Sequence, residues 1–208
     1  MKNLNYVLAL MLSIVSFSVS AQNFPLETYK SAKITYLGLD YTHTRFIDDF
    51  AFTSAEELTT KLIRTWNHMI ISEPDKYDFK KFTNKSEAII DLELMNERNK
   101  KIDPSLIIQN DFFDLKLEEI PQIVRTIDFG DLDGVVTFFI VGTYNKNALI
   151  ASYYLVLYDI DQAEMIYSKK YTSKPGGFGV KNYWARTYYD VLLQVEKDYK
   201  KKWSKGKN

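Results

Sequence analysis

Residues 134–158 read GVVTFFIVGTYNKNALIASYYLVLY, and this stretch decides the fold class of the chain. Two apolar runs, 134–144 and 149–158, flank the turn Asn145-Lys146-Asn147, where asparagine accepts a positive φ. Neither run alternates between apolar and polar residues, which indicates strands that are covered on both faces. The stretch therefore predicts two neighbouring antiparallel strands in the middle of a sheet.

The chain that follows predicts a third strand and a long helix. Residues 165–172 form the strand, and its pair Lys169-Lys170 is typical of a sheet edge that charge protects from aggregation. A helix is expected over 182–203, because its apolar residues recur at helical spacing. These are Trp184, Tyr188, Leu192, Val195, Tyr199 and Trp203. The C-terminal part is thus predicted to be a three-stranded antiparallel meander followed by an amphipathic helix.

The chain before residue 134 mixes strand and helix patterns. Residues 22–30 are a short lead-in, and residues 102–114 have no readable pattern. Strands are expected at 33–46 and 77–82, and helices at 54–72, 86–99 and 117–127. Ser54 and Glu57 form a capping box at the start of the first helix, and Pro121 must lie in the first turn of the third. We therefore predict an α/β fold, a mixed sheet with helices packed on it.

The N-terminus has the features of a cleavable secretory signal. Lys2 precedes an apolar run over 6–19, and the small residue Ala21 suits signal peptidase. We expect a signal peptide at 1–21 and a single α/β domain at 22–208, located in the periplasm or outside the cell. The alternative is a retained N-terminal anchor, but the run is shorter than the roughly 20 residues that a helix needs to span a bilayer.

Composition excludes several kinds of chemistry. The chain has no cysteine, which rules out thiol catalysis, zinc–thiolate sites, iron–sulfur clusters and lipid attachment at cysteine. It has 27 basic and 27 acidic residues, so no basic excess favours nucleic acid as a partner. No cofactor and no metal are expected, because no complete ligand or cofactor motif is present.

The C-terminal third resembles exported bacterial proteins that are largely uncharacterised. The resemblance rests on four short motifs. They are Thr143-Tyr144-Asn145-Lys146, Leu157-Tyr158-Asp159-Ile160, Gly176-Gly177-Phe178-Gly179 and Asn182-Tyr183-Trp184. By the order of its elements over about 33–200, the chain is also remotely similar to the periplasmic domains of curli-secretion and penicillin-binding-protein-activator lipoproteins. This resemblance implies a domain that binds other envelope proteins, although the acylated cysteine of those lipoproteins is absent here.

One glycine-rich loop is the candidate ligand site. Gly176, Gly177 and Gly179 precede the last helix, and a helix N-terminus attracts anions through its free N–H groups. Tyr183, Trp184 and Arg186 follow in the first turns of that helix and complete the candidate set. The spacing matches neither the P-loop nor the dinucleotide motif, and a flexible connection is the alternative interpretation.

A second cluster places an imidazole near carboxylates. His43 lies between Asp40 and the pair Asp48-Asp49, and together they are the ingredients of a metal site or an acid/base pair. The chain has only two histidines, and side chains three residues apart on a strand point to opposite faces. Polar residues at a strand end are therefore the simpler interpretation.

These observations favour an exported, non-catalytic binding or assembly module of the bacterial cell envelope. Its partner is expected to be another envelope protein, with no stable membrane insertion after signal cleavage. The alternative is a small-molecule or glycan-binding protein that uses the Gly176–Gly179 loop. A hydrolase built around Asp40, His43 and Asp48 ranks third, and no catalytic residue is assigned.

Overall fold

The structure is a computed structural model that describes residues 23–48, 51–52 and 54–206. The predicted signal peptide and Asp49 lie outside the described residues. The described elements, in chain order, are α1 (Leu26–Ser31), β1 (Ile34–Asp40), β2 (Arg45–Ile47), α2 (Ala55–Glu57), the π-helical turn η1 (Leu58–Leu62), α3 (Ile63–Ser72), α4 (Phe79–Thr83), β3 (Ala88–Ile90), α5 (Glu93–Asn99), α6 (Pro104–Ile107), β4 (Ile108–Gln109), the 3₁₀ turn η2 (Leu117–Glu119), α7 (Ile120–Arg125), β5 (Val135–Asn145), β6 (Ile150–Asp159), β7 (Glu164–Ser173), α8 (Val180–Lys201) and the 3₁₀ turn η3 (Trp203–Lys205).

The sheet is mixed and centres on β5. On one side of β5, the strands β1 and β2 lie end to end and both run parallel to it, and β3 and β4 extend this side, again in parallel. On the other side β6 pairs antiparallel with β5, and β7 pairs antiparallel with β6. Lys169 and Lys170 lie on β7, which pairs only with β6 among the described strands. Lys169 forms an ion pair with Asp198 of α8, and Lys170 forms one with Asp114. The two lysine side chains therefore lie on different faces of the sheet.

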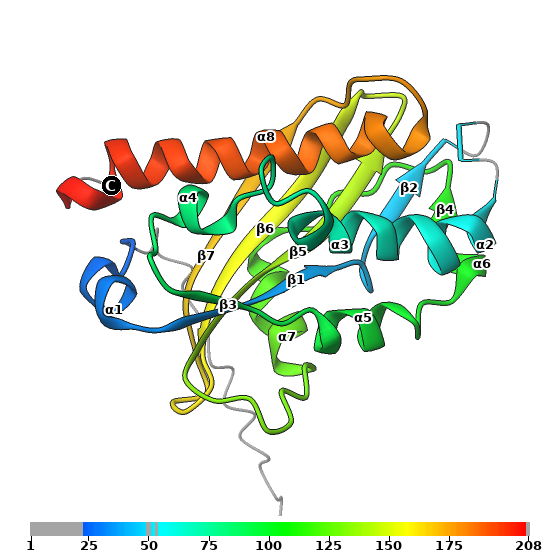
Figure 1. The fold of residues 1–208 in the computed structure, drawn as a ribbon. Helices are drawn as coiled ribbons and strands as arrows, with labels where there is room; N and C mark the ends of the chain where they lie inside the picture. The colour runs from blue at the N-terminus through cyan, green and yellow to red at the C-terminus, as the bar shows by residue number, and fades with distance from the viewer. Residues whose placement is uncertain (1–22, 49–50, 53, 207–208) are drawn as a thin grey trace, which may run out of the picture.

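Helices cover both faces of this sheet (Figure 1). α8, α3 and α4 pack on one face, against side chains such as Tyr36, Phe139 and Tyr153. α7 packs on the other face, against Val136, Phe138 and Ile140. All eleven residues of β5 are buried, as the continuous apolar pattern of this strand predicts.

The expected strand over 33–46 is interrupted in the middle. β1 ends at Asp40, the chain turns over 41–44, and β2 resumes the pairing with β5 at Arg45. The Asp40 carboxylate causes the turn, because it accepts hydrogen bonds from the main-chain N of Thr42 (2.9 Å) and from its hydroxyl (2.7 Å). The prediction of one continuous strand is therefore wrong.

Two other assignments are corrected. Residues 79–83 are a short helix, α4, instead of the expected strand, because Asp78 caps the main-chain N of Lys81 (3.1 Å). The helix expected from residue 86 begins only at Glu93, and residues 88–90 form β3 beside β1. Asp91 separates the two, since its carboxylate accepts from the main-chain N of Glu93 (3.0 Å).

Several helix ends follow the sequence pattern. The Ser54 hydroxyl accepts from the main-chain N of Glu57 (3.0 Å), α3 ends at Ser72, and Pro121 lies in the first turn of α7. α8 begins two residues earlier than expected, at Val180, and Trp203 follows it in η3. Within the part of the chain that the structure describes, no helix combines the length and the apolar character required to span a membrane.

Candidate functional site

The three glycines of the predicted loop site have a conformational role. Gly177 has a φ of +110° and Gly179, the N-cap of α8, a φ of +77°, a region that other residues rarely adopt. The main-chain N of Gly176 donates to the carbonyl of Tyr183 (3.0 Å), which folds the loop back onto the helix. The glycines thus shape the entry into α8.

The other three predicted residues have different hydrogen-bond and packing partners. Trp184 is buried, and its ring stacks on that of Tyr144 with centroids 4.7 Å apart. The Tyr183 hydroxyl accepts from Lys146 Nζ (2.9 Å), and Arg186 Nε donates to Asp190 Oδ1 (2.8 Å). The Tyr183 ring contacts the Trp184 ring edge-on, with centroids 5.4 Å apart, whereas Arg186 is held by Asp190.

A hollow of about 310 Å³ lies beside the start of α8. Its walls come from Ala51 and Phe52, from residues 54–65, and from Val180 and Lys181. Phe52, Leu58 and Leu62 contribute apolar surface, but none of the six predicted site residues lines it. Sequence reasoning missed this hollow, because its walls are over 100 residues apart in the chain.

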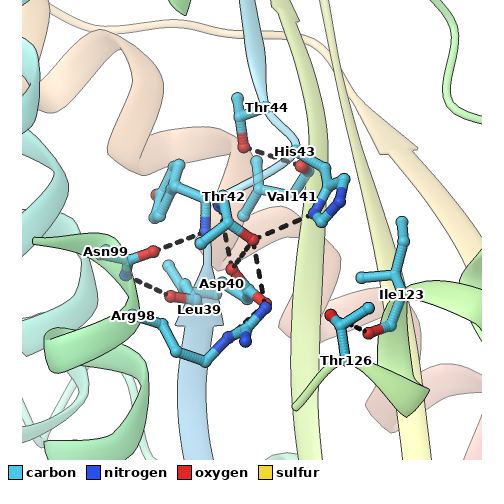
Figure 2. Close-up of polar contacts among 11 residues, drawn as sticks. Leu39, Asp40, Thr42, His43, Thr44, Arg98, Asn99, Ile123, Thr126 and Val141 are labelled. Atoms are coloured by element: carbon cyan, nitrogen blue, oxygen red, sulfur yellow. Dashed lines mark hydrogen bonds and ion pairs between the residues drawn. The ribbon is translucent and has the colours of Figure 1, made fainter. Parts of the chain in front are cut away.

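The Asp40 cluster lies at the break between β1 and β2 (Figure 2). Asp40 is fully buried, and its Oδ2 accepts from both Nε (3.1 Å) and Nη2 (3.0 Å) of Arg98 on α5. Its Oδ1 accepts both hydrogen bonds from Thr42. Each oxygen of the carboxylate thus accepts two hydrogen bonds, and the carboxylate holds the turn in place.

His43 is connected to this carboxylate through Thr42, as Figure 2 shows. His43 Nδ1 lies 3.0 Å from the Thr42 hydroxyl oxygen, which already gives its only proton to Asp40. While this proton points to Asp40, the hydroxyl oxygen can only accept from Nδ1, the reverse of the direction in which a catalytic histidine activates a hydroxyl. Burial lowers the pKa of His43, with Asp40 opposing this and the nearby Arg98 and Arg45 adding to it.

The remaining carboxylates do not extend this cluster into a metal site. Asp48 follows β2 with a φ of +95°, and its main-chain N donates to the carbonyl of Gln109 on β4 (3.1 Å). Among the described residues, no group of three or more potential metal ligands lies close enough together to hold an ion.

Asparagine side chains take the place of a neighbouring strand at the end of β1. The main-chain N of Leu39 donates to Asn67 Oδ1, and the carbonyl of Leu39 accepts from Asn99 Nδ2, both at 2.8 Å. Asn67 Nδ2 also donates to Asn96 Oδ1 (2.8 Å), and Asn96 Nδ2 lies 3.1 Å from His68 Nε2. This asparagine network joins α3, α5 and β1 into one rigid unit.

A groove lies between α3 and α5, over this network. It encloses about 500 Å³, and its walls and floor come from α3, from residues 89–92 and from α5. The lining residues are Arg64, His68, Ile71, Ile89, Ile90, Asp91, Leu92, Glu93, Asn96, Glu97 and Lys100. It lies past the end of the parallel strand β3.

The groove combines exposed apolar side chains with charges of both signs. Ile71 is 52% exposed and Ile89 is 44% exposed. Arg64 and Lys100 supply positive charge to the lining, and Asp91, Glu93 and Glu97 supply negative charge. Sequence reasoning assigned Ile89 to a helix face and so missed the groove.

Comparisons with known proteins find only remote likenesses. No family model matches the chain, and no curated protein matches its sequence. The C-terminal domain of LpoB from Salmonella enterica is 11% identical and has a TM-score of 0.28, over 69% of this chain and 83% of that one. Lipoprotein GNA1162 from Neisseria meningitidis is 12% identical and has a TM-score of 0.32, over 79% and 96%.

A third solved structure is a Helicobacter pylori protein described as a homolog of neuraminyllactose-binding hemagglutinin. It is 9% identical and has a TM-score of 0.33, over 89% of this chain and 90% of that one. The likeness to bacterial envelope lipoproteins that the sequence predicted is thus confirmed only as a remote structural similarity. Scores at this level carry no argument about function, which must come from the chain itself.

Proposed function

We propose that the chain is an exported, non-catalytic binding module of the bacterial cell envelope, and that the groove between α3 and α5 takes another envelope protein. The observation that carries the proposal is the pair Ile71 and Ile89, which expose about half of their surface inside a charged groove. Protein interfaces combine an apolar centre with a polar rim in this way.

The rigidity of the groove supports this proposal. The network from His68 through Asn96 and Asn67 to the main chain of Leu39 ties both helices to the sheet. A surface that is already ordered loses little conformational entropy when a partner binds. The groove is therefore suited to binding in its present shape.

The chemistry of the Asp40 cluster supports a non-catalytic role. Both oxygens of Asp40 are engaged in hydrogen bonds, and the Thr42 hydroxyl next to His43 donates to Asp40. The buried Asp40–Arg98 pair accounts for these residues as part of the fold.

The groove is tested by photocrosslinking from position 71 in the producing bacterium. A photoreactive amino acid in place of Ile71 should give one discrete adduct with an envelope protein, and Ile71→Asp should abolish co-purification of that protein. Leu106 on α6 is the matched control, since it is 60% exposed but does not line the groove. An equal adduct from position 106, or none from either groove isoleucine, would contradict the proposal.

Export is tested separately through the N-terminus of the mature protein. The pattern of Lys2, the apolar run and Ala21 predicts cleavage after Ala21. Mass spectrometry of the protein from the producing cell should therefore find a chain that begins at Gln22. A mature protein that still begins at Met1 would exclude a cleaved signal.

A further inference from the structure

The most exposed large apolar side chain among the described residues is that of Phe178, at 95%. It lies between Gly177 and Gly179, whose positive φ angles turn the chain on either side of it. Val180 (45% exposed) follows it, and Leu149 (47% exposed) lies in the turn between β5 and β6. The pairing of Ala151 with Ser173 places this turn and the loop at the same end of the sheet (Figure 1).

The charged residues within the two chain segments that carry these apolar side chains are all basic. Residues 145–150 and 173–182 contain Lys146, Lys174 and Lys181 and no aspartate or glutamate. Lys181 lies 3.8 Å from Glu73, and Lys146 binds the uncharged Tyr183 hydroxyl. Within the described part of the chain, no carboxylate forms an ion pair with Lys146 or Lys174. We call Lys146, Leu149, Lys174, Phe178 and Val180 the loop surface.

We propose that the loop surface docks reversibly on an anionic lipid surface, with the Phe178 ring entering the interface. Aromatic rings favour the boundary between lipid and water, and lysines beside the membrane are attracted to anionic headgroups. A single projecting ring offers less contact area than a standard protein interface needs, whereas a bilayer requires no complementary shape. This inference is independent of the groove and adds a second contact to the proposed function.

Tryptophan fluorescence can report the position of this ring. Trp66, Trp184 and Trp203 are all buried, so a tryptophan placed at 178 would be the exposed one in the variant chain. With vesicles of phosphatidylglycerol and phosphatidylcholine, Phe178→Trp should show a blue shift, and the protein should float with the vesicles. Phe112→Trp is the matched control, because Phe112 is 82% exposed but lies beside Asp111 and near Asp114.

Two substitutions separate the apolar and the electrostatic contributions. Phe178→Ala should lower the partition coefficient about tenfold or more, as expected for the loss of one buried aromatic ring. Lys174→Glu should lower it as well, and added salt should weaken binding of the natural chain. The absence of a blue shift at 178, equal shifts at 178 and 112, or equal binding to pure phosphatidylcholine would overturn the proposal. The crosslinking result from position 71 does not depend on membrane binding. It therefore still tests the groove if the membrane proposal fails.

Discussion

Replacing Gly38 with alanine is expected to destabilise the protein by about 4 kcal/mol, because the substitution combines backbone strain with overpacking. Gly38 has a φ of +97°, and a Cβ added there would lie 2.2 Å from Asn67 Oδ1 and 2.9 Å from Leu92 Cδ2. Asn67 cannot move away without losing its hydrogen bonds to Leu39 and Asn96. Guanidinium denaturation of the Gly38→Ala variant would measure the loss in free energy of unfolding.

Gly130→Ala is the matched control for this experiment. Gly130 also has a positive φ, +57°, but nothing lies within 4 Å of a Cβ added there. It should therefore lose only the backbone contribution, about 1–2 kcal/mol. Equal losses in the two variants would show that the contact with Asn67 adds nothing to the cost at Gly38.

Replacing Asp40 with alanine is expected to cost about 3–5 kcal/mol, because it leaves a largely buried guanidinium without its partner. The Arg98 side chain is only 16% exposed and gives two hydrogen bonds to Asp40 Oδ2. The main-chain N and the hydroxyl of Thr42 would lose their acceptor as well. Denaturant titration of Asp40→Ala would measure the loss.

Two comparisons test the cause of this loss. The double variant Asp40→Leu/Arg98→Met should recover much of the stability, since apolar side chains replace both charges. Asp190→Ala removes the surface ion pair with Arg186, whose side chain is 56% exposed, and should cost less than about 1 kcal/mol. If Asp40→Ala costs no more than Asp190→Ala, the buried pair does not stabilise the turn.

These two substitutions act on the same structural unit as the proposed groove. Asp40 and Gly38 lie at the end of β1, and the asparagine network connects this end to α3 and α5. We therefore expect partial loss of order in the groove before global unfolding in both variants. The Ile71→Asp substitution, in contrast, changes the surface of the groove and leaves the network intact.

The sequence predicted those strands and helices that have a recognisable pattern within their own residues. The buried strands β5 and β6 followed from uninterrupted apolar runs, and α8 from a stripe of apolar residues at helical spacing. Ser54 and Pro121 marked helix starts through local hydrogen bonding and ring geometry. Each of these signals lies within a few residues of the structure that it predicts.

One failed assignment depended on a local cap, and the other two depended on neighbours that are distant in sequence. The spacing of the aromatic residues from Tyr77 to Phe82 fits a strand and a helical turn equally well. The side chain of Asp78 caps the main-chain N of Lys81 and so favours the helical turn. Ile89 and Ile90 continue a helical pattern, but pairing with β1 makes them a strand. The argument that Asp40 and His43 face apart failed because the strand ends at Asp40, where Arg98 from α5 completes the carboxylate's hydrogen bonds.

By itself, the sequence determined the mixed α/β character, the buried central strands and the absence of thiol chemistry, because composition and local periodicity are properties of single segments. The tertiary structure alone decided that Phe178 projects from the loop. It also created the groove, whose walls come from α3, β3 and α5. A surface of this kind exists only once packing and hydrogen bonds bring separate segments together, so no local pattern encodes it.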